Sequence, residues 1–409
     1  MDEQYVSAAL CYVKRKQKAR NPEPVRRNDV DWLRVLAVFL LFHFHTAAIF
    51  YPGMYVKNPE SNPIIELFVM YVHQWHMPLF FMLAGMSAFY ALDRRSGPQY
   101  VQERFKRLFV PLVFGTLVLV PPQVYLSLKS NLWYSDSYLE FYPRFFNGPY
   151  PAGNFQWAHL WFLTYLLPYS LITLPLFRHI KRGEPKPALV SGAASLCERP
   201  WGMLVFGLPL ALIEAAFRPG WPGLQNLYDD WANFFLYLCC FVYGCLFCAD
   251  RRFGEALERR LLSTAVLAVV FMGICLALFL SGRCPVDSYT PAGMALHFLR
   301  GWHMWFWLVL FLGLGQRHLT FRNRALDYAK EAALPVYILH QPVIVAIGFY
   351  VVRWQAGVLP KFLAIDAGAF VVTLLIYDLA VRRWRVPRFL MGMRSRCSYP
   401  RKPWTAPNG

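Results

Sequence analysis

Ten apolar segments, separated by polar and often basic connections, run along the chain. A helix of about 20 apolar residues, at a rise of about 1.5 Å per residue, crosses the hydrocarbon core of a membrane. The pattern therefore predicts an all-α bundle of about ten transmembrane helices, of which the fifth is the shortest. The predicted segments are 30–51, 66–92, 105–128, 157–177, 201–217, 231–249, 261–281, 294–315, 332–352 and 360–380.

The basic residues predict how the bundle is oriented. The two tails and the connections on their side of the bundle hold 33 Lys and Arg, whereas the other side holds 7. Cytoplasmic loops carry an excess of Lys and Arg, so we expect both termini to be cytoplasmic. Residues 1–29 and 381–409 would then be basic cytoplasmic tails around a membrane domain of residues 30–380.

Composition agrees with a membrane protein. The chain is 56% hydrophobic and 16% charged, too few polar side chains to cover a water-soluble globule of 409 residues. A large soluble β-barrel is the lower-ranked alternative. The net charge is +18, and the basic residues lie in short clusters between apolar runs. The orientation of the helices in the membrane explains these clusters without a nucleic-acid partner. Residues 1–29 contain no apolar core of a signal peptide.

Four cysteines, Cys239, Cys240, Cys245 and Cys248, lie within one apolar run. No second pair of ligands follows at the spacing of a zinc site, and small apolar cysteines are ordinary in helices. We interpret them as structural and expect no metal.

Ionisable residues inside a membrane-spanning segment are costly, so each is a candidate functional residue. In the first segment Arg34 and His45 are eleven residues apart, three helical turns plus about 20°, so both lie on one face along about 16 Å. Asp31 is one turn from Arg34 and can pair with it. For Arg34 alone, snorkelling to the inner interface is an equally good interpretation. His45 lies too deep for that, and His43 projects to another face and ranks lower.

Other intramembrane histidines are interpreted first as polar contacts between helices. His76 and His303 rank next to His45, because Trp302 and other tryptophans beside them would line an aromatic cavity. By helical rise His45, His76 and His303 lie about 10, 15 and 13 Å from the outer boundary. We therefore expect their rings to face one cavity open to the outside, with Arg34 reached from the inside through the same bundle. Glu214 and Asp366 also lie in apolar runs, and the sequence does not explain why acidic residues occur there.

Five short blocks resemble the membrane proteins of acyltransferase family 3. Asp31-Trp32-Leu33-Arg34 followed by His45 is similar to the family's first helix, and the block from His76 to Gly85 is similar to its second. Arg104-Phe105-Lys106-Arg107 with Pro111, the block from His159 to Leu163, and the block from Tyr337 to Pro342 resemble further family segments. Ala84 departs from the pattern, since many members have Ser there. The blocks span most of the chain and occur in the family's order.

The resemblance implies transfer of an acyl group, such as acetyl or succinyl, from cytoplasmic acyl-CoA to a hydroxyl of an extracytoplasmic glycan or glycolipid. Within the family the chain resembles the glucan succinyltransferases, which implies a multi-pass protein of a bacterial cytoplasmic membrane. The phosphates of CoA need a basic inner mouth, for which Arg34, Arg104 and Arg107 are candidates together with Arg94 and Arg95.

An alcohol is a poor nucleophile at neutral pH, so its acylation needs a base. Histidine, with an ordinary pKa near 6.5, suits this role. His45 is the predicted base, with Arg34 as its catalytic companion, and an acyl-histidine intermediate would use the same residue. His76, His303 and Trp302 are the predicted substrate-binding residues.

Two other classes of function remain open from the sequence. A transporter or flippase for an acylated or glycosylated lipid would line its pathway with Arg34 and His45, although no inverted repeat is visible. A structural scaffold is ranked last, because it gains nothing from so many intramembrane histidines. The aromatic connection 129–156 is interpreted as packing on the membrane surface, ahead of a sugar-stacking platform.

Overall fold

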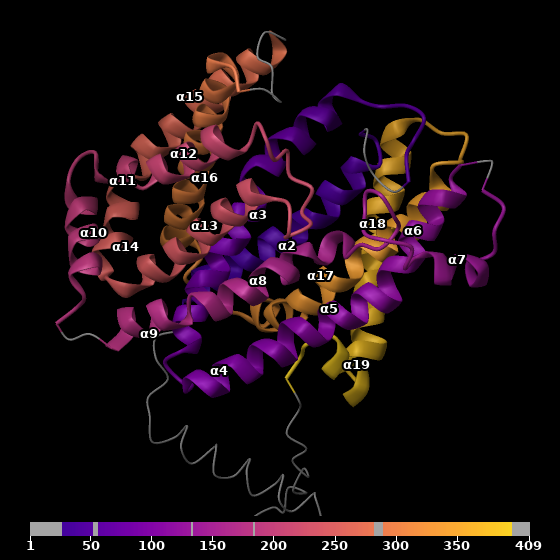
Figure 1. The fold of residues 1–409 in the computed structure, drawn as a ribbon, viewed down its shortest axis with the longest axis horizontal. Coiled ribbons are helices and arrows are strands. Elements are labelled where there is room, and N and C mark those ends of the chain that lie inside the picture. Colours follow the sequence, from indigo (N-terminus) through magenta and orange to yellow (C-terminus); the bar gives the residue numbers. More distant parts are fainter. Residues whose placement is uncertain (1–26, 52–55, 132–133, 183–184, 282–288, 395–409) are drawn as a thin grey trace, which may run out of the picture.

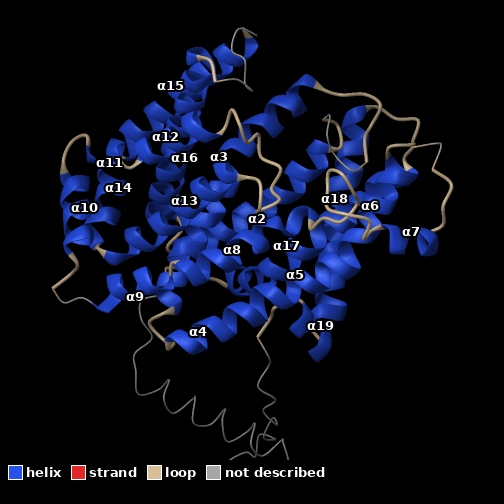
Figure 2. Cartoon of the chain, viewed as in Figure 1, coloured by secondary structure: helices blue, strands red, loops and turns tan. Residues whose placement is uncertain are grey.

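The computed structural model describes residues 27–51, 56–131, 134–182, 185–281 and 289–394. In these ranges every named element is a helix, and the only β-bridge is an isolated one between Pro149 and Phe155 (Figure 2). The predicted all-α fold is confirmed.

Eight helices in the described ranges are long and apolar enough to cross a membrane, and a bent pair makes a ninth. The predicted polytopic bundle is therefore confirmed. Seven of the eight are α2 (Asn28–Ala48), α3 (Pro63–Ala91), α13 (Trp231–Ala249), α15 (Leu261–Leu280), α16 (Pro291–His318), α17 (Arg324–Val351) and α18 (Val358–Ile376), which continues as η4 (Tyr377–Val381). The eighth is the run Gly97–Lys129. The bent pair joins η3 (Ala158–Leu160) and α8 (Trp161–Ile172) to α9 (Leu174–Arg182) at 55°.

The third predicted segment is one continuous helical run that contains two π-helical turns. It comprises α4 (Gly97–Arg104), η1 (Phe105–Phe109), α5 (Val110–Phe114), η2 (Gly115–Leu119) and α6 (Val120–Lys129). Pro111 and Pro121 follow the two π turns, and proline lacks the N–H that an α-helix needs at an interior position. The wider turns accommodate the prolines without ending the run.

The fifth predicted segment forms two short helices, α11 (Gly202–Val205) and α12 (Gly207–Phe217), which do not reach the length of a full crossing. Gly207 lies against α16, where a Cβ atom would be 2.6 Å from the Trp302 ring. α12 therefore packs closely along α16. A second short apolar helix is α10 (Ala188–Glu198).

The central helices of the bundle are α2, α3, α13, α16 and α17, and α15 and α18 lie at its edges (Figure 1). The edge helices expose apolar side chains, including Leu262 at 80% on α15 and Leu363 at 55% on α18. Such exposure suits contact with lipid and explains why the sequence has too few polar residues for a soluble surface.

Both ends of the described chain lie on one side of the bundle. Arg27 and Arg394, the first and last described residues, line the same cavity. Part of the predicted C-terminal tail is helical, as α19 (Arg385–Leu390), and packs against α5 and η4. The rest of both predicted tails lies outside the described residues. That this side is cytoplasmic stays a prediction.

Two shorter helices cover the ends of the bundle. In α7 (Tyr138–Arg144) and after it, Phe141 and Phe145 are completely buried, which supports packing as the role of the aromatic connection. The helix α14 (Arg251–Arg259) begins at Asp250, whose carboxylate accepts a hydrogen bond from the Arg252 N–H at 3.0 Å and pairs with Lys186 at 2.9 Å.

Candidate active site

A strongly basic cavity of about 390 Å³ lies among the ends of α2, α3, α4 and α17, within the size range of small-molecule sites. We call it the basic cavity. Asp31 and Glu103 are the acidic side chains of its lining. The basic side chains are Arg27, Arg34, Arg94, Arg95, Arg104, Arg107, Lys330 and Arg394. The arginines that the sequence assigned to an inner mouth are thus brought together.

Arg34 is held at the cavity wall by two polar contacts. Its guanidinium lies 3.3 Å from the Asp31 carboxylate and donates a hydrogen bond to the Ser87 hydroxyl. Ser87 in turn donates to the Leu83 carbonyl at 2.6 Å. Ser87 lies three residues after Ala84, the position at which the sequence departs from the family pattern, so α3 still offers a hydroxyl to the cavity one helical turn further on.

Glu103 gathers several cations at the mouth of the cavity. It pairs with Arg95, with Arg107 at 3.7 Å and with Arg394 at 3.4 Å. Burial, and to a smaller extent the neighbouring arginines, hold the pKa of Arg95 below its ordinary value even though Glu103 opposes the shift. The cavity therefore carries more positive charge than its own acids neutralise, as a site for an anion does.

Arg104 and Arg107 lie one helical turn apart and are oriented by different contacts. The Arg104 guanidinium lies over the Tyr100 ring, 4.6 Å from its centroid. The Arg107 Nε donates to the Gly392 carbonyl at 3.2 Å. These contacts orient both guanidinium groups at the basic lining.

His45 belongs to a cluster of three imidazoles from α2, η3 and α17. The His45 ring centroid lies 5.1 Å from that of His340, which lies 5.4 Å from that of His159. The His340 Nδ1–H donates to the Tyr337 carbonyl at 2.6 Å, and the His159 Nε2–H donates to the Ile338 carbonyl at 2.9 Å.

These carbonyl partners assign the protons, because a carbonyl only accepts. The buried nitrogens His340 Nε2 and His159 Nδ1 are then unprotonated and carry free lone pairs. These two nitrogens and His45 Nδ1 have no hydrogen-bond partner among the described residues. The cluster therefore offers proton-accepting nitrogens in a buried setting. Sequence reasoning ranked His340 as a helix contact and gave His159 no role, although both lie in blocks that resemble the family.

Tyr337 connects the histidine cluster to the basic cavity. Its side chain lines the cavity, and its ring centroid lies 5.9 Å from those of both His159 and His340. His45 itself is not part of the lining, although Arg34 on the same helix is. The cavity and the imidazoles are thus neighbours separated by one aromatic ring, rather than one open space.

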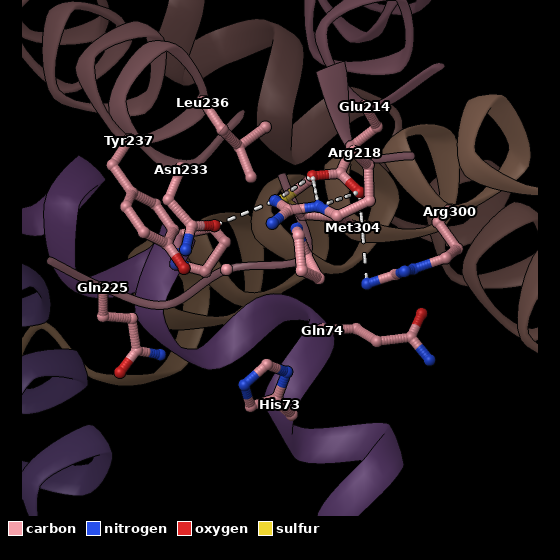
Figure 3. A pocket seen from close by; sticks show the side chains of 13 residues that line it. His73, Gln74, Glu214, Arg218, Gln225, Asn233, Leu236, Tyr237, Arg300 and Met304 are labelled. Atoms are coloured by element: carbon pink, nitrogen blue, oxygen red, sulfur yellow. Dashed lines mark hydrogen bonds and ion pairs between the residues drawn. The ribbon is translucent and has the colours of Figure 1, made fainter. Parts of the chain in front are cut away.

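A second, smaller cavity of about 70 Å³ lies towards the other end of α3 (Figure 3). We call it the polar pocket. His73 and Gln74 line it, about 20 Å along α3 from Ser87 of the basic cavity, at about 1.5 Å per residue. Its other polar lining residues are Glu214, Arg218, Gln225, Asn233, Tyr237 and Arg300.

Comparison with known proteins identifies the family. A family model described as an acyltransferase domain matches residues 27–379, most of the chain. The chain belongs to acyltransferase family 3. Curated relatives include the proteins named glucans biosynthesis protein C from Salmonella heidelberg, Salmonella schwarzengrund and Salmonella paratyphi A. Each is 23% identical over 386 residues, covering 88% of this chain and 93% of the relative. No solved structure matches the chain. The protein is therefore a multi-pass membrane acyltransferase.

In this acyltransferase the predicted substrate-binding residues line neither cavity. The His76 Nε2–H donates to the Ala37 carbonyl at 2.9 Å, and Trp302 packs against Gly207. His303 is 1% exposed, and neither ring nitrogen has a partner within the described ranges. The polar pocket is lined instead by His73 and Arg300, each three residues, or about one turn, before a predicted histidine.

The two unexplained acids are both paired. Glu214 binds Arg218 at 2.5 Å within α12 and its C-terminal end, and Asp366 of α18 lies 2.9 Å from the His43 Nδ1 of α2. Side chains far apart in the sequence supply the second pair, so the sequence alone gave no signal for it. In the described residues no three His, Cys, Asp or Glu side chains converge as metal ligands would.

Proposed function

We propose that this acyltransferase moves an acetyl, succinyl or similar group from cytoplasmic acyl-CoA to a hydroxyl of an extracytoplasmic glycan or glycolipid. The observation that carries the proposal is the basic cavity, in which seven arginines and one lysine face two acids. CoA bears several phosphate groups, and arginine binds phosphate through paired hydrogen bonds. Arg34, Arg104 and Arg107 would hold the CoA phosphates.

The cavity directs the thioester towards the histidine cluster. Its inner lining includes Val38, Phe80 and Tyr337, which are largely apolar and suit the acyl end of the donor. Beyond Tyr337 lie His340 and His45. In this arrangement the charged nucleotide stays among the arginines while the acyl group approaches the imidazoles.

His45 would act as the base. As the acceptor hydroxyl attacks the thioester carbonyl carbon, an imidazole nitrogen takes the hydroxyl proton, the C–S bond breaks, and CoA leaves as a thiolate that regains the proton. General-base catalysis of this kind accounts for about 10²- to 10⁴-fold in rate. The names of the curated relatives, which refer to glucan biosynthesis, support a carbohydrate acceptor.

The test uses the purified full-length protein in lipid nanodiscs with labelled acetyl-CoA or succinyl-CoA and a glucose oligosaccharide. We expect release of free CoA together with labelled saccharide. His45→Ala should retain its fold but lose transfer by at least about 10²-fold. His318→Ala, an exposed histidine at the end of α16, is the matched control and should transfer normally.

Two results would count against the proposal. Near-normal acylation by His45→Ala removes His45 as the base. Movement of a labelled lipid across the membrane without consumption of acyl-CoA indicates the flippase alternative instead.

A further inference from the structure

The polar pocket contains charged groups that the proposed chemistry does not use. Glu214 and Arg218 are 3% and 9% exposed at their side chains, and the Arg218 guanidinium also donates to the Asn233 amide oxygen at 2.8 Å. Arg300 lies 4.0 Å from the Glu214 carboxylate. A buried ion pair is costly to desolvate, so stability alone gives no reason to retain it in an apolar helix.

A structured loop forms one wall of the pocket. The Asp230 carboxylate accepts from the Tyr165 hydroxyl at 2.9 Å, from the Gln225 backbone N–H at 2.8 Å and from the Asn233 amide at 2.9 Å. The Gln225 carbonyl accepts from the Trp157 indole at 2.8 Å. Gln225 has φ of +57°, a left-handed conformation that costs free energy in a residue other than glycine. These hydrogen bonds hold the Gln225 side chain at the pocket.

Several polar groups remain available in the pocket. Figure 3 shows the Glu214–Arg218 pair on one side, His73 and Gln74 on the other, and Gln225 and Arg300 towards its two ends. The Gln74 Oε1 is buried and has no hydrogen-bond partner in the described part of the chain. An unsatisfied buried acceptor costs free energy that a bound donor recovers.

We propose that the polar pocket binds the hydroxyl-bearing edge of a sugar unit of the acceptor. The inference rests on the proposed function, which it extends by assigning the acceptor to particular residues. Gln74 and Gln225 would contact the sugar hydroxyls through their amides, and Arg300 would donate to a hydroxyl or ring oxygen. His73 is exposed to the pocket and would cover a face of the ring.

The lining selects a neutral polyhydroxylated ligand over an anion. A sugar hydroxyl both donates and accepts, which matches two primary amides that offer both functions. An anion only accepts: Arg300 would attract it, but Arg218 is already paired with Glu214 and Asn233, and the Gln74 carbonyl oxygen and the Glu214 carboxylate would repel it. The pocket volume of about 70 Å³ has room for a few water-sized groups, and therefore for the edge of one sugar ring.

The pocket also has the right position relative to the proposed base. The Phe44 ring is stacked on His73 with centroids 6.2 Å apart, and it makes an edge contact with His45 with centroids 5.2 Å apart. A sugar held at His73 is therefore one aromatic ring away from the histidine cluster. The acceptor would reach His45 past Phe44, while the donor approaches past Tyr337.

The experiment measures the KM for the acceptor and the KM for the donor separately, on the full-length protein in nanodiscs. The probe is a linear β-linked glucopentaose, with acetyl-CoA as donor. Loss of one hydrogen bond predicts a rise of about two- to tenfold in the acceptor KM for Gln74→Ala and for Gln225→Ala, with the KM for acetyl-CoA unchanged. Gln102→Ala, an exposed glutamine on α4 that lines neither cavity, is the matched control.

Direct binding distinguishes failure of this inference from failure of the proposed function. Calorimetry without any acyl donor should detect glucopentaose binding to the wild-type protein, weakened in both variants. An acceptor KM and a binding constant equal to wild type in both variants overturn the pocket assignment even if acyl transfer is intact. Preference of the pocket for glycerol phosphate over glucopentaose also overturns it. Absence of acyl transfer with saccharide binding intact overturns the proposed function and leaves the pocket in place. Because Gln225 lies on a loop, its variant serves if Gln74→Ala fails to fold.

Discussion

Replacement of Gly85 by Ala tests the helix packing that fixes the position of the two cavities relative to each other. Gly85 of α3 lies so close to α13 that a Cβ atom would be 1.9 Å from the Phe241 carbonyl oxygen. The approach is reciprocal, since a Cβ on Gly244 would be 1.9 Å from the Met82 carbonyl oxygen. Small residues allow such close contact between helices in membranes.

The structure sets the size of the effect. Carbon and carbonyl oxygen atoms in contact between helices are about 3.3–3.6 Å apart, so Gly85→Ala must separate the backbones by about 1.4 Å. The stacked rings of Phe81 and Tyr237, with centroids 4.6 Å apart, lie between the same two helices. Overpacking of this kind costs about 1–3 kcal/mol, and more if the helices cannot move apart.

We expect Gly85→Ala to lower the apparent melting temperature by several degrees and to raise the acceptor KM, because Tyr237 of α13 and His73 of α3 both line the polar pocket. The control is Gly273→Ala on α15, where an added Cβ meets nothing within 4 Å. That change should be neutral or slightly stabilising, since Ala favours a helix by up to about 1 kcal/mol over Gly. Intrinsic tryptophan fluorescence during heating measures both variants. If the two melted at the same temperature, the close approach of α3 and α13 would be refuted.

Three further changes test other parts of the argument. Arg34→Lys should slow acyl transfer about tenfold or more and raise the KM for acyl-CoA, because an ammonium cannot span Asp31 and a ligand phosphate as a guanidinium does; an unchanged rate makes Arg34 a simple anchor. Burial raises the pKa of Asp250, but the hydrogen bonds and charges of its Arg and Lys neighbours outweigh burial and hold this pKa below the ordinary 3.8. The ionised Asp250 therefore stabilises the fold above pH 3.8, and this stabilisation is lost as the pH falls through the lowered pKa. Melting curves of the wild type should therefore fall more steeply below about pH 4 than those of Asp250→Asn, which lacks the titrating group but keeps a capping side chain. Alkaline phosphatase fused after Gly409 should be inactive and near Ser137 active, and activity of the first fusion would contradict cytoplasmic termini.

The helices themselves were largely predictable from the sequence. α13 runs from Trp231 to Ala249, as predicted, because an acidic residue flanks the apolar run at each end. The resemblance implied a CoA donor and therefore a basic mouth with Arg34, Arg104 and Arg107, and all three line the basic cavity. Depth along a helix follows directly from the residue number.

Rotation of each helix about its axis was not predictable in the same way. His76 and His303 line neither cavity, and the residues that line the polar pocket are His73 and Arg300, one turn away. Which side faces a cavity depends on contacts such as those of Gly207 and Gly85 with neighbouring helices, and these join residues far apart in the chain. For the same reason the meeting of His45 with His340 appears only in the fold.

The distribution of charge distinguishes the basic cavity from the other polar groups of this bundle. Glu214 is paired with Arg218 and Asp366 with His43, so each acid has a close polar partner that limits its cost in an apolar setting. The basic cavity is different, because its eight cations face two acids in the lining, and cations stay in excess even though Arg27 and Lys330 pair with Asp29 and Asp327 beside it. Repulsion among like charges weakens a fold unless a counter-charge neutralises it. The excess positive charge lies next to the Tyr337 ring, which contacts two of the three clustered imidazoles. An excess of cations next to unprotonated imidazole nitrogens is of use to a protein that binds an anionic donor and removes a proton beside it. A scaffold or an apolar lipid pathway would gain nothing from that combination, and this is the physical argument for placing the chemistry between Arg34 and His45.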